Sequence, residues 1–353
     1  MISTEQHMHA WHQTLIDHGA SLDDTQSFIF PESAGYVSVD DSRSSCFYLS
    51  HLRCIEITGG DAHDFLQGQL SCDMNTISDT HSGIGSHNNL KGRMISSFRI
   101  LKISEAYHLI IDQSIADECV AQLNKYAVFS DVQIKINPDM IFLGVQSTTI
   151  DKALHNKSSS NGAVSATSTA HSIRVSHSTA RNMFALNVIH AQGKWTQLLA
   201  SCTPTNNVVW KALDIHDGLS WITHATQDMF LPQSLNYHLI DGLSFTKGCY
   251  IGQEVIVRTQ HRGKIKRILS RFVIDSASLT SPSAITPGHA LHHGGKTIGV
   301  ITSTAQIGKR HYVLAVVHID YAEFTDGLCD EHDQEIHINS ADTSTPFSIS
   351  KSS

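Results

Sequence analysis

Short apolar runs separated by amphipathic stretches fill the first third of the chain. In GGDAHDFLQGQL, Asp61 can cap a helix whose Leu66 and Leu70 fall on one face. A second helical pattern runs from about residue 115 to residue 126. Strands are predicted for 28–40, 45–57, 93–103, 107–112 and the DVQIKI run. Helices alternating with strands of antiparallel character predict an α+β fold.

A similar rhythm returns in the middle of the chain. The runs at 141–147 and 183–189 predict strands, and GKWTQLLASC and VVWKALDIHDG predict helices, the second closed by Gly218 as a C-terminal cap. Between them, the Ser, Thr and Ala-rich segment 155–172 predicts a surface loop. The pattern of this half therefore predicts a second α+β unit that is related to the first.

From about residue 265 the pattern changes to short apolar strands separated by Gly and Pro turns. This texture is typical of a small β-barrel or sandwich. The predicted organisation is a first α+β unit at 28–137, a second at 138–262, a C-terminal β-barrel at 265–340 and a disordered tail at 341–353.

Composition narrows the class of function. A chain of 353 residues that is 41% hydrophobic can build two or three cores, and a formal charge of -8 argues against a protein coated for duplex DNA. The N-terminus has no apolar signal region, and no run approaches the roughly 20 apolar residues of a membrane span. The sequence therefore predicts a cytoplasmic protein with neither a membrane nor a DNA partner.

The seven cysteines are scattered without a CxxC pair, and the 24 histidines are dispersed. A disulfide framework or a zinc ribbon would cluster such residues. We therefore predict no bound metal.

The stretch FTKGCYIGQEVIVRTQHRG at 245–263 combines a thiol, a carboxylate and several cations. Gly248 and Gly252 are expected to take backbone conformations closed to other residues, and a helix fits from Gln253 onward. Cys249 is then expected just before the helix N-terminus, where the helix dipole and Lys247 favour a thiolate. A small buried residue in a tight turn fits this position equally well, so both interpretations stay open.

Three neighbouring groups have two interpretations each. Glu254 can accept hydrogen bonds from a heterocycle with adjacent N–H donors, or complement the helix dipole. Arg258 and Arg262, four residues apart, can clamp a carboxylate or phosphate, or form a solvated basic face. Tyr250 can stack on a ligand or pack in the core.

The octapeptide KGCYIGQE at 247–254 matches the signature K-G-C-Y-x-G-Q-E of the YgfZ-type folate-binding proteins, relatives of the glycine-cleavage T protein. FLQGQLSCDM at 65–74, NLKGRMISSFRI at 89–100 and LPQSLN at 231–236 are similar to further segments of that family. The resemblance covers roughly residues 30–340 and leaves out the Ser-rich segment and both termini.

This resemblance implies a T-protein-like fold: two interlocked α+β units and a small barrel around an opening that holds tetrahydrofolate. It implies support of iron–sulfur protein assembly or repair and, through it, thio-modification of tRNA, with Cys249 as the thiol near the folate. The partners implied are folate and iron–sulfur client or assembly proteins. The folate-binding residues that we expect are Asp73, Asn75, Lys247, Tyr250, Gly252, Gln253, Glu254, Arg258 and Arg262.

One departure bears on chemistry. Where the aminomethyltransferases carry an Asp pair that positions the substrate amine, this chain has Ser96 and Ser97. A hydroxyl is neutral and cannot stabilise a developing cation as a carboxylate does. The resemblance therefore predicts a surviving pocket and leaves it uncertain whether the protein is an enzyme.

Two alternative functions stay open. One is a folate-dependent one-carbon transferase or a thiol-based catalyst that uses Cys249. The other is a folate-sensing module that binds a partner protein or tRNA through KIKR at 264–267, which continues the basic run from Arg262. Such a cluster more often forms a solvated hinge than an RNA site, so direct tRNA contact is the less favoured interpretation.

Overall fold

The structure is a computed structural model, and it describes residues 3–24, 27–31, 44–154, 160–176, 179–262, 266–276, 285–321, 328–329 and 335–336. Its contacts form two compact units. The first comprises Met1–Leu66, Met74–Gly83 and Phe98–Trp210, and the second comprises Gln67–Asp73, Ile84–Ser97 and Lys211–Ser353. The second unit thus takes two short segments from the first third of the chain. The predicted boundaries at 137 and 262 stay predictions, and the predicted tail at 341–353 lies outside the described residues.

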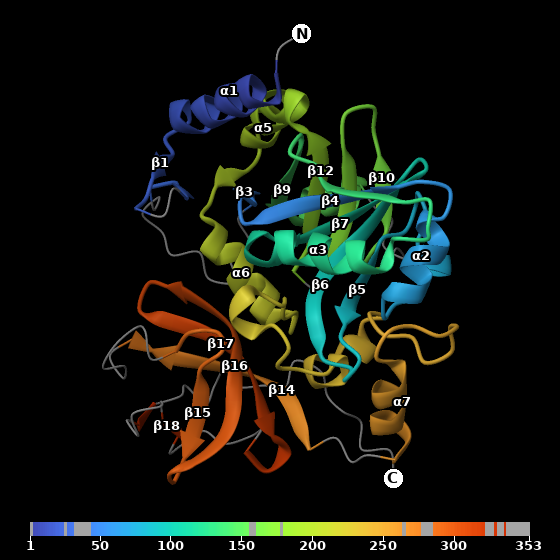
Figure 1. Ribbon diagram of the computed structural model, residues 1–353. Helices are drawn as coiled ribbons and strands as arrows, with labels where there is room; N and C mark the ends of the chain where they lie inside the picture. The colour runs from blue at the N-terminus through green and yellow to red at the C-terminus, as the bar shows by residue number, and fades with distance from the viewer. Residues whose placement is uncertain are drawn as a thin grey trace. The chain divides into compact units, whose positions relative to one another are not determined.

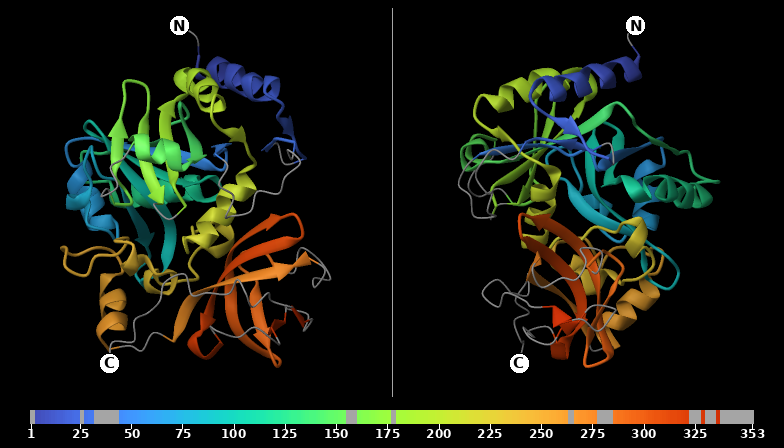
Figure 2. Two further views of the ribbon diagram at one scale, coloured as in Figure 1. Left: turned by 180° about the vertical axis from the view of Figure 1, so that it is seen from behind. Right: turned by 90° about the vertical axis from the view of Figure 1, so that its left-hand side faces the viewer.

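The N-terminal helix α1 (Thr4–Asp17) belongs to the core of the first unit. Ser3 caps it through a reciprocal pair of hydrogen bonds with Gln6, which satisfies two backbone N–H groups at the helix start. Trp11 is buried on its inner face and meets Trp195 of α5 (Ala191–Leu199) edge to face, with ring centroids 5.7 Å apart. The two helices lie side by side (Figure 1 and Figure 2).

A six-stranded sheet of the first unit has the order β10-β11-β12-β9-β3-β13, antiparallel except where β13 pairs with β3. The strands are β3 (Ser45–Tyr48), β9 (Met140–Gln146), β10 (Val164–Ala166), β11 (His171–Ser176), β12 (Arg181–Asn187) and β13 (Thr203–Pro204). The surface-loop prediction for 155–172 is wrong in part: β10 and the start of β11 lie within it, because small Ser and Ala residues hide strand periodicity. Residues 155–159 lie outside the described residues.

A five-stranded sheet has the order β5-β6-β7-β4-β8, and helix α3 (Ala116–Tyr126) packs on β4 and β8. Its strands are β4 (Leu52–Thr58), β5 (Gly83–Asn88), β6 (Met94–Ile103), β7 (Ala106–Asp112) and β8 (Gln133–Ile136). Among the described residues before 217, the remaining strands and α-helices are β1 (Ser21–Leu22), β2 (Phe28–Ile29), α2 (Ala62–Gln69), α4 (Thr148–Leu154) and α6 (Asn207–His216). The predicted α+β class is confirmed.

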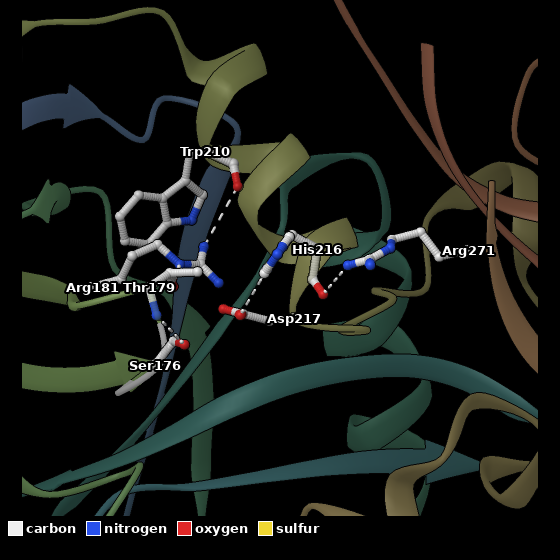
Figure 3. A network of polar contacts seen from close by, with 7 residues as sticks. All are labelled: Ser176, Thr179, Arg181, Trp210, His216, Asp217 and Arg271. Atoms are coloured by element: carbon white, nitrogen blue, oxygen red, sulfur yellow. Dashed lines mark hydrogen bonds and ion pairs between the residues drawn. The ribbon is translucent and has the colours of Figure 1, made fainter. Parts of the chain in front are cut away.

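A buried arginine lies at the start of β12 in the first unit (Figure 3). Arg181 is fully buried, and its Nε donates to Thr179 Oγ1 at 3.0 Å while its guanidinium lies 4.8 Å from the centre of the Trp210 ring. Figure 3 also draws a contact within the second unit, where Arg271 Nη1 donates to the carbonyl oxygen of His216 at 2.9 Å. Each guanidinium therefore satisfies groups of its own unit.

The C-terminal part of the second unit is a sheet of order β14-β17-β16-β15-β18-β19, drawn in orange and red in Figure 1. Its strands are β14 (Arg267–Asp275), β15 (Ala290–His293), β16 (Lys296–Ile307), β17 (Arg310–His318), β18 (Leu328–Cys329) and β19 (Glu335–Ile336). Phe272, Ile301 and Val313 belong to its core. The predicted β-rich part is present, and within the part of the chain that the structure describes its strands do not close into a barrel.

Candidate functional site

The signature segment folds as a turn that leads into helix α7 (Gln253–Arg262). The turn is closed by a hydrogen bond from the Gln253 N–H to the Tyr250 carbonyl at 3.2 Å. Gly252, directly before the helix, has φ of 80°, a value that L side chains rarely adopt. The helix start predicted at Gln253 and the special conformation predicted at Gly252 are both confirmed.

Gly252 and Gly92 bring two of the family-like segments into backbone contact. A Cβ built on Gly252 would lie 2.5 Å from the Asn89 carbonyl oxygen and 2.9 Å from Gly92 Cα. A Cβ on Gly92, whose φ is 73°, would in turn meet Val255 and Ile256 of α7 at 3.3 and 3.1 Å. Both glycines are therefore required by close approach as well as by backbone conformation.

The turn between β5 and β6 that carries Gly92 is organised by Asn89. Its Oδ1 accepts from the N–H groups of Lys91 at 2.8 Å and Arg93 at 3.0 Å, and its Nδ2 donates to Asp228 at 2.9 Å. An asparagine that bonds to its own turn in this way fixes the backbone locally. The signature helix consequently packs on a rigid turn.

Lys247 points into the protein. Its Nζ donates to the carbonyl oxygens of Leu70 at 2.8 Å and Cys72 at 2.7 Å and lies 5.2 Å from the centre of the Tyr250 ring. Burial lowers the pKa of Lys247 to about 8, and the negative charge of Asp73 offsets part of this effect. The lysine thus fastens the FLQGQLSCD segment to the signature turn.

Tyr250 is also buried and faces inward. Its hydroxyl donates to the Ser244 carbonyl at 3.2 Å, and burial raises its pKa. Of the two interpretations of this ring, core packing against Lys247 describes its surroundings in the structure.

A buried group of polar side chains lies behind the turn and was missed from the sequence. Ser71 Oγ donates to the Gly242 carbonyl at 2.6 Å and accepts from Ser86, whose hydroxyl also lies 3.0 Å from Asn88 Oδ1. Among the described residues, Asn88 Nδ2 has no hydrogen-bond partner although it is buried. Ser71 stands within the FLQGQLSCD segment that the sequence had singled out. Its partners Ser86 and Gly242 lie far away in sequence, so its buried hydrogen bonds could not be predicted.

Three predicted site residues face outward. Cys249 is exposed, whereas Cys46, Cys54, Cys72, Cys119 and Cys202 are buried. Glu254, in the first turn of α7, and Arg258, one turn later, are exposed as well. Arg262 is the last residue of the helix, and its side chain lies outside the described set. The turn therefore presents a thiol, a carboxylate and a guanidinium to solvent.

The expectation for Gly248 is wrong. Its φ is outside the left-handed region, and a Cβ at this position would meet no atom within 4 Å. Gln253 Nε2 donates to the Gly248 carbonyl at 3.4 Å, so this part of the turn is held by a side chain. Neither the φ angle nor the surroundings of Gly248 therefore require a glycine at this position.

The structure places Asp73 in the second unit and Asn75 in the first. Asp73 is half-buried and accepts from Gln67 Nε2 at 2.9 Å. Asn75 lies exposed on the short 3-10 helix Met74–Thr76. Asp73 is one residue beyond Cys72, which Lys247 binds, so the Lys247 anchor constrains its position.

Ser96 and Ser97 are fully buried on β6. Ser97 Oγ accepts from the backbone N–H of Ile222 at 2.8 Å, which ties the DGLSWI loop to this strand. Ser97 is therefore engaged in holding the fold of the second unit together.

Within the described residues there is no group of three or more His, Cys, Asp and Glu side chains placed to hold a metal ion. In the same part of the chain, none of the helices has the length and apolar character that a bilayer crossing requires.

No family model matches the chain. Over 273 residues it is 30% identical to the tRNA-modifying protein YgfZ of Yersinia pestis (strain Pestoides F), covering 76% of this chain and 82% of that protein. Over 220 residues it is 32% identical to the tRNA-modifying protein YgfZ of Vibrio atlanticus (strain LGP32), covering 62% of this chain and 67% of that protein. The chain belongs to the YgfZ family. The resemblance based on the KGCYIGQE signature is thereby confirmed.

The fold of this YgfZ family member is similar to that of the glycine cleavage system aminomethyltransferase T from Bartonella henselae. The TM-score is 0.70 over 95% of this chain and 94% of that one, at 15% sequence identity. The predicted T-protein-like fold is confirmed, and at this identity the likeness concerns the fold alone.

Proposed function

We propose that this protein binds tetrahydrofolate and supports the assembly or repair of iron–sulfur proteins and, through it, the thio-modification of tRNA. The observation that supports this most strongly is the joining of three family-like segments inside one unit. Gly252 contacts Gly92, and Lys247 binds the carbonyls of Leu70 and Cys72. A turn built with this much internal constraint presents its outward groups in a fixed arrangement, as ligand recognition requires.

The outward groups match the chemistry of a folate. The pterin ring of folate has adjacent N–H groups, and a carboxylate such as that of Glu254 can accept hydrogen bonds from them. The glutamate tail of folate is anionic and can pair with the guanidinium of Arg258. The buried Nδ2 of Asn88, with no partner among the described residues, is a further donor in the same unit. When bound, tetrahydrofolate would supply one-carbon chemistry, and these residues would bind and orient it.

Cys249 is the group best suited to act on a partner. It is exposed, and it follows an anchored lysine, so its position is defined. A single thiol can react with a partner's disulfide or ligate a cluster transiently together with a client protein. Its exposure also favours thiol-based catalysis as a second candidate function.

The surroundings of the Ser pair argue against aminomethyl transfer. Ser97 already accepts a backbone hydrogen bond, and a hydroxyl cannot neutralise the cationic intermediate of that reaction. We therefore place the activity in binding and thiol chemistry, with client or assembly proteins as partners.

The folate part is tested by calorimetric titration with tetrahydrofolate. We expect saturable binding by the wild type and at least about tenfold weaker binding by Glu254→Ala, because a charged acceptor is lost. The matched control is Glu105→Ala, which removes an exposed carboxylate from the turn between β6 and β7 of the first unit. Equal binding by wild type and Glu254→Ala would contradict the placement of the pterin at this turn.

The tRNA part is tested separately in cells that lack the protein. Thio-modified nucleosides are quantified by mass spectrometry after complementation with the wild type, Cys249→Ser or Cys54→Ser, a buried thiol of β4 in the first unit that serves as control. We expect the wild type to restore the modification and Cys249→Ser to lose most of it. Full restoration by Cys249→Ser would remove the thiol from the proposal. A gel shift of tRNA that depends on Lys266 and Arg267 would instead favour direct contact with RNA.

A further inference from the structure

A pocket of about 440 Å³ lies in the first unit, beneath helix α1. Its lining comes from α1, β2, β3, β4, β8 and β9 and from the turns that join them. Its described lining includes none of the residues predicted from the signature. A volume of this size, with mainly apolar walls and a few polar groups, is typical of a site for a small organic molecule.

One wall of this pocket is aromatic. The rings of His12 and Phe28 have centroids 4.8 Å apart, and Tyr48 lies 5.8 Å from Phe28 and 6.4 Å from His12. Tyr48 is held from behind by Trp11, which it meets edge to face at 5.3 Å. The wall is thus a fixed set of rings that offers π-faces and edges to a flat ligand.

The charged group of the lining is Arg53. Its Nη1 donates to the carbonyls of Ser50 at 3.0 Å and Leu52 at 3.1 Å, which orients the guanidinium. Arg53 is exposed, and its Nε and Nη2 N–H groups take no part in these two bonds. Two parallel N–H groups of this kind form the fork that binds a carboxylate bidentately.

The described residues that line the pocket include no Asp or Glu. Asn137 on the wall donates to Glu56 at 2.7 Å, and Glu56 is paired with Lys135 at 3.1 Å, so that nearby carboxylate is already compensated. Burial lowers the pKa of His12, and the charges of His9 and Arg53 lower it further, which favours the neutral form of the ring. The pocket therefore offers one cation beside a neutral aromatic wall.

We infer that this pocket is a binding site for a small aromatic carboxylate. The carboxylate would pair with the Nε and Nη2 edge of Arg53, and the ring would lie against His12, Phe28 and Tyr48. An aliphatic acid would lose the ring contacts, and a neutral aromatic molecule would lose the ion pair. The inference is independent of the folate proposal because it uses no residue of the signature turn.

Binding is measured on the full chain by saturation-transfer NMR and calorimetry with three probes. Indole-3-acetate carries both features, indole-3-acetamide is its neutral isostere, and hexanoate is an acid without a ring. We expect saturable binding of indole-3-acetate and at least about tenfold weaker binding of each of the other two. Each titration is run both without and with excess tetrahydrofolate, so that a probe drawn to a folate site is recognised by its displacement.

Two charge variants locate the site. Arg53→Gln should weaken indole-3-acetate binding by about tenfold or more, whereas Lys125→Gln, which removes an exposed cation from α3 of the same unit, should leave it unchanged. Arg53→Lys keeps the charge without the fork, so its affinity should lie between those of the wild type and Arg53→Gln. Thermal melts confirm that each variant is folded.

The outcomes are decisive in either direction. Equal affinity for the acetate and the acetamide, or unchanged binding by folded Arg53→Gln, would overturn the inference. So would the absence of saturable indole-3-acetate binding up to millimolar concentration. Binding that disappears once tetrahydrofolate is added would assign the probe to the folate site and equally refute the pocket.

Discussion

The inward and outward residues of the signature turn differ in what holds them. Lys247, Tyr250 and Gly252 are buried, and each has defined contacts with backbone groups of the second unit. Cys249 and Glu254 are exposed. Eight consecutive residues therefore serve two purposes: one set builds the turn, and the other is available for chemistry.

The two glycines of the motif make this difference sharp. Gly252 has a positive φ and no space for a Cβ, because the Asn89 carbonyl is 2.5 Å away from where it would lie. Gly248 has neither constraint. A glycine in a motif is therefore not by itself a sign of backbone strain. The close approach to Gly92 explains why Gly252 is a glycine, and nothing comparable applies to Gly248.

The largest expected effect is that of Gly252→Ala. The substitution combines a disfavoured φ, at about 1–2 kcal/mol, with an overlap that displaces the backbone, so we expect the free energy of unfolding to fall by about 3 kcal/mol or more. Gly248→Ala is the matched control and should change it by no more than about 0.5 kcal/mol. Urea unfolding measures both, and similar losses in the two variants would refute the contrast between the glycines.

A smaller loss is expected for Lys247→Met. The methionine fills the space but leaves the carbonyls of Leu70 and Cys72 without their donor, which should lower the free energy of unfolding by about 2 kcal/mol. Lys91→Met removes an exposed lysine from the same unit and should be nearly neutral. If Lys247→Met unfolds at the wild-type urea concentration, the anchor assigned to this lysine does not exist.

The smallest effect is a dependence on pH. Burial lowers the pKa of Lys247 to about 8, so above this pH the unfolded chain binds a proton that the folded chain has released. Stability then rises with pH until the ordinary lysine pKa of about 10.5 is reached, and below about pH 8 this group contributes no slope. From about pH 7.5 to about pH 9 we expect the wild type to gain about 1 kcal/mol relative to Lys247→Met. A difference that falls over this range has the wrong sign and would reject the buried amine.

Much of the fold was readable from local patterns. The helix at Gln253 and the helix over 115–126 follow from capping, glycine placement and apolar spacing, which act within a few residues. The YgfZ resemblance was readable as well, because KGCYIGQE is long and unusual in composition. Local signals of this kind do not need knowledge of distant neighbours.

The contacts of the site were not readable in the same way. Lys247 was expected at the ligand, but its partners are carbonyl groups 177 and 175 residues away in sequence, and backbone acceptors carry no sequence signature. The same holds for Ser97, which accepts from Ile222 across 125 positions. β10 was missed for another reason, because it has only three residues and lies in a segment rich in Ser, Thr and Ala that resembles a loop.

The second unit is built from three separate segments, and this affects how it forms during synthesis. The segments are Gln67–Asp73, Ile84–Ser97 and Lys211–Ser353. On the ribosome, the first two segments emerge more than 100 residues before the lysine and the glycine that later bind them. At a synthesis rate of about 5–20 residues per second, they wait for many seconds with unpaired backbone groups. A nascent chain halted near Trp210 carries every segment of the first unit, but its FLQGQLSCD and NLKGR segments still lack the contacts that Lys247 and Gly252 supply.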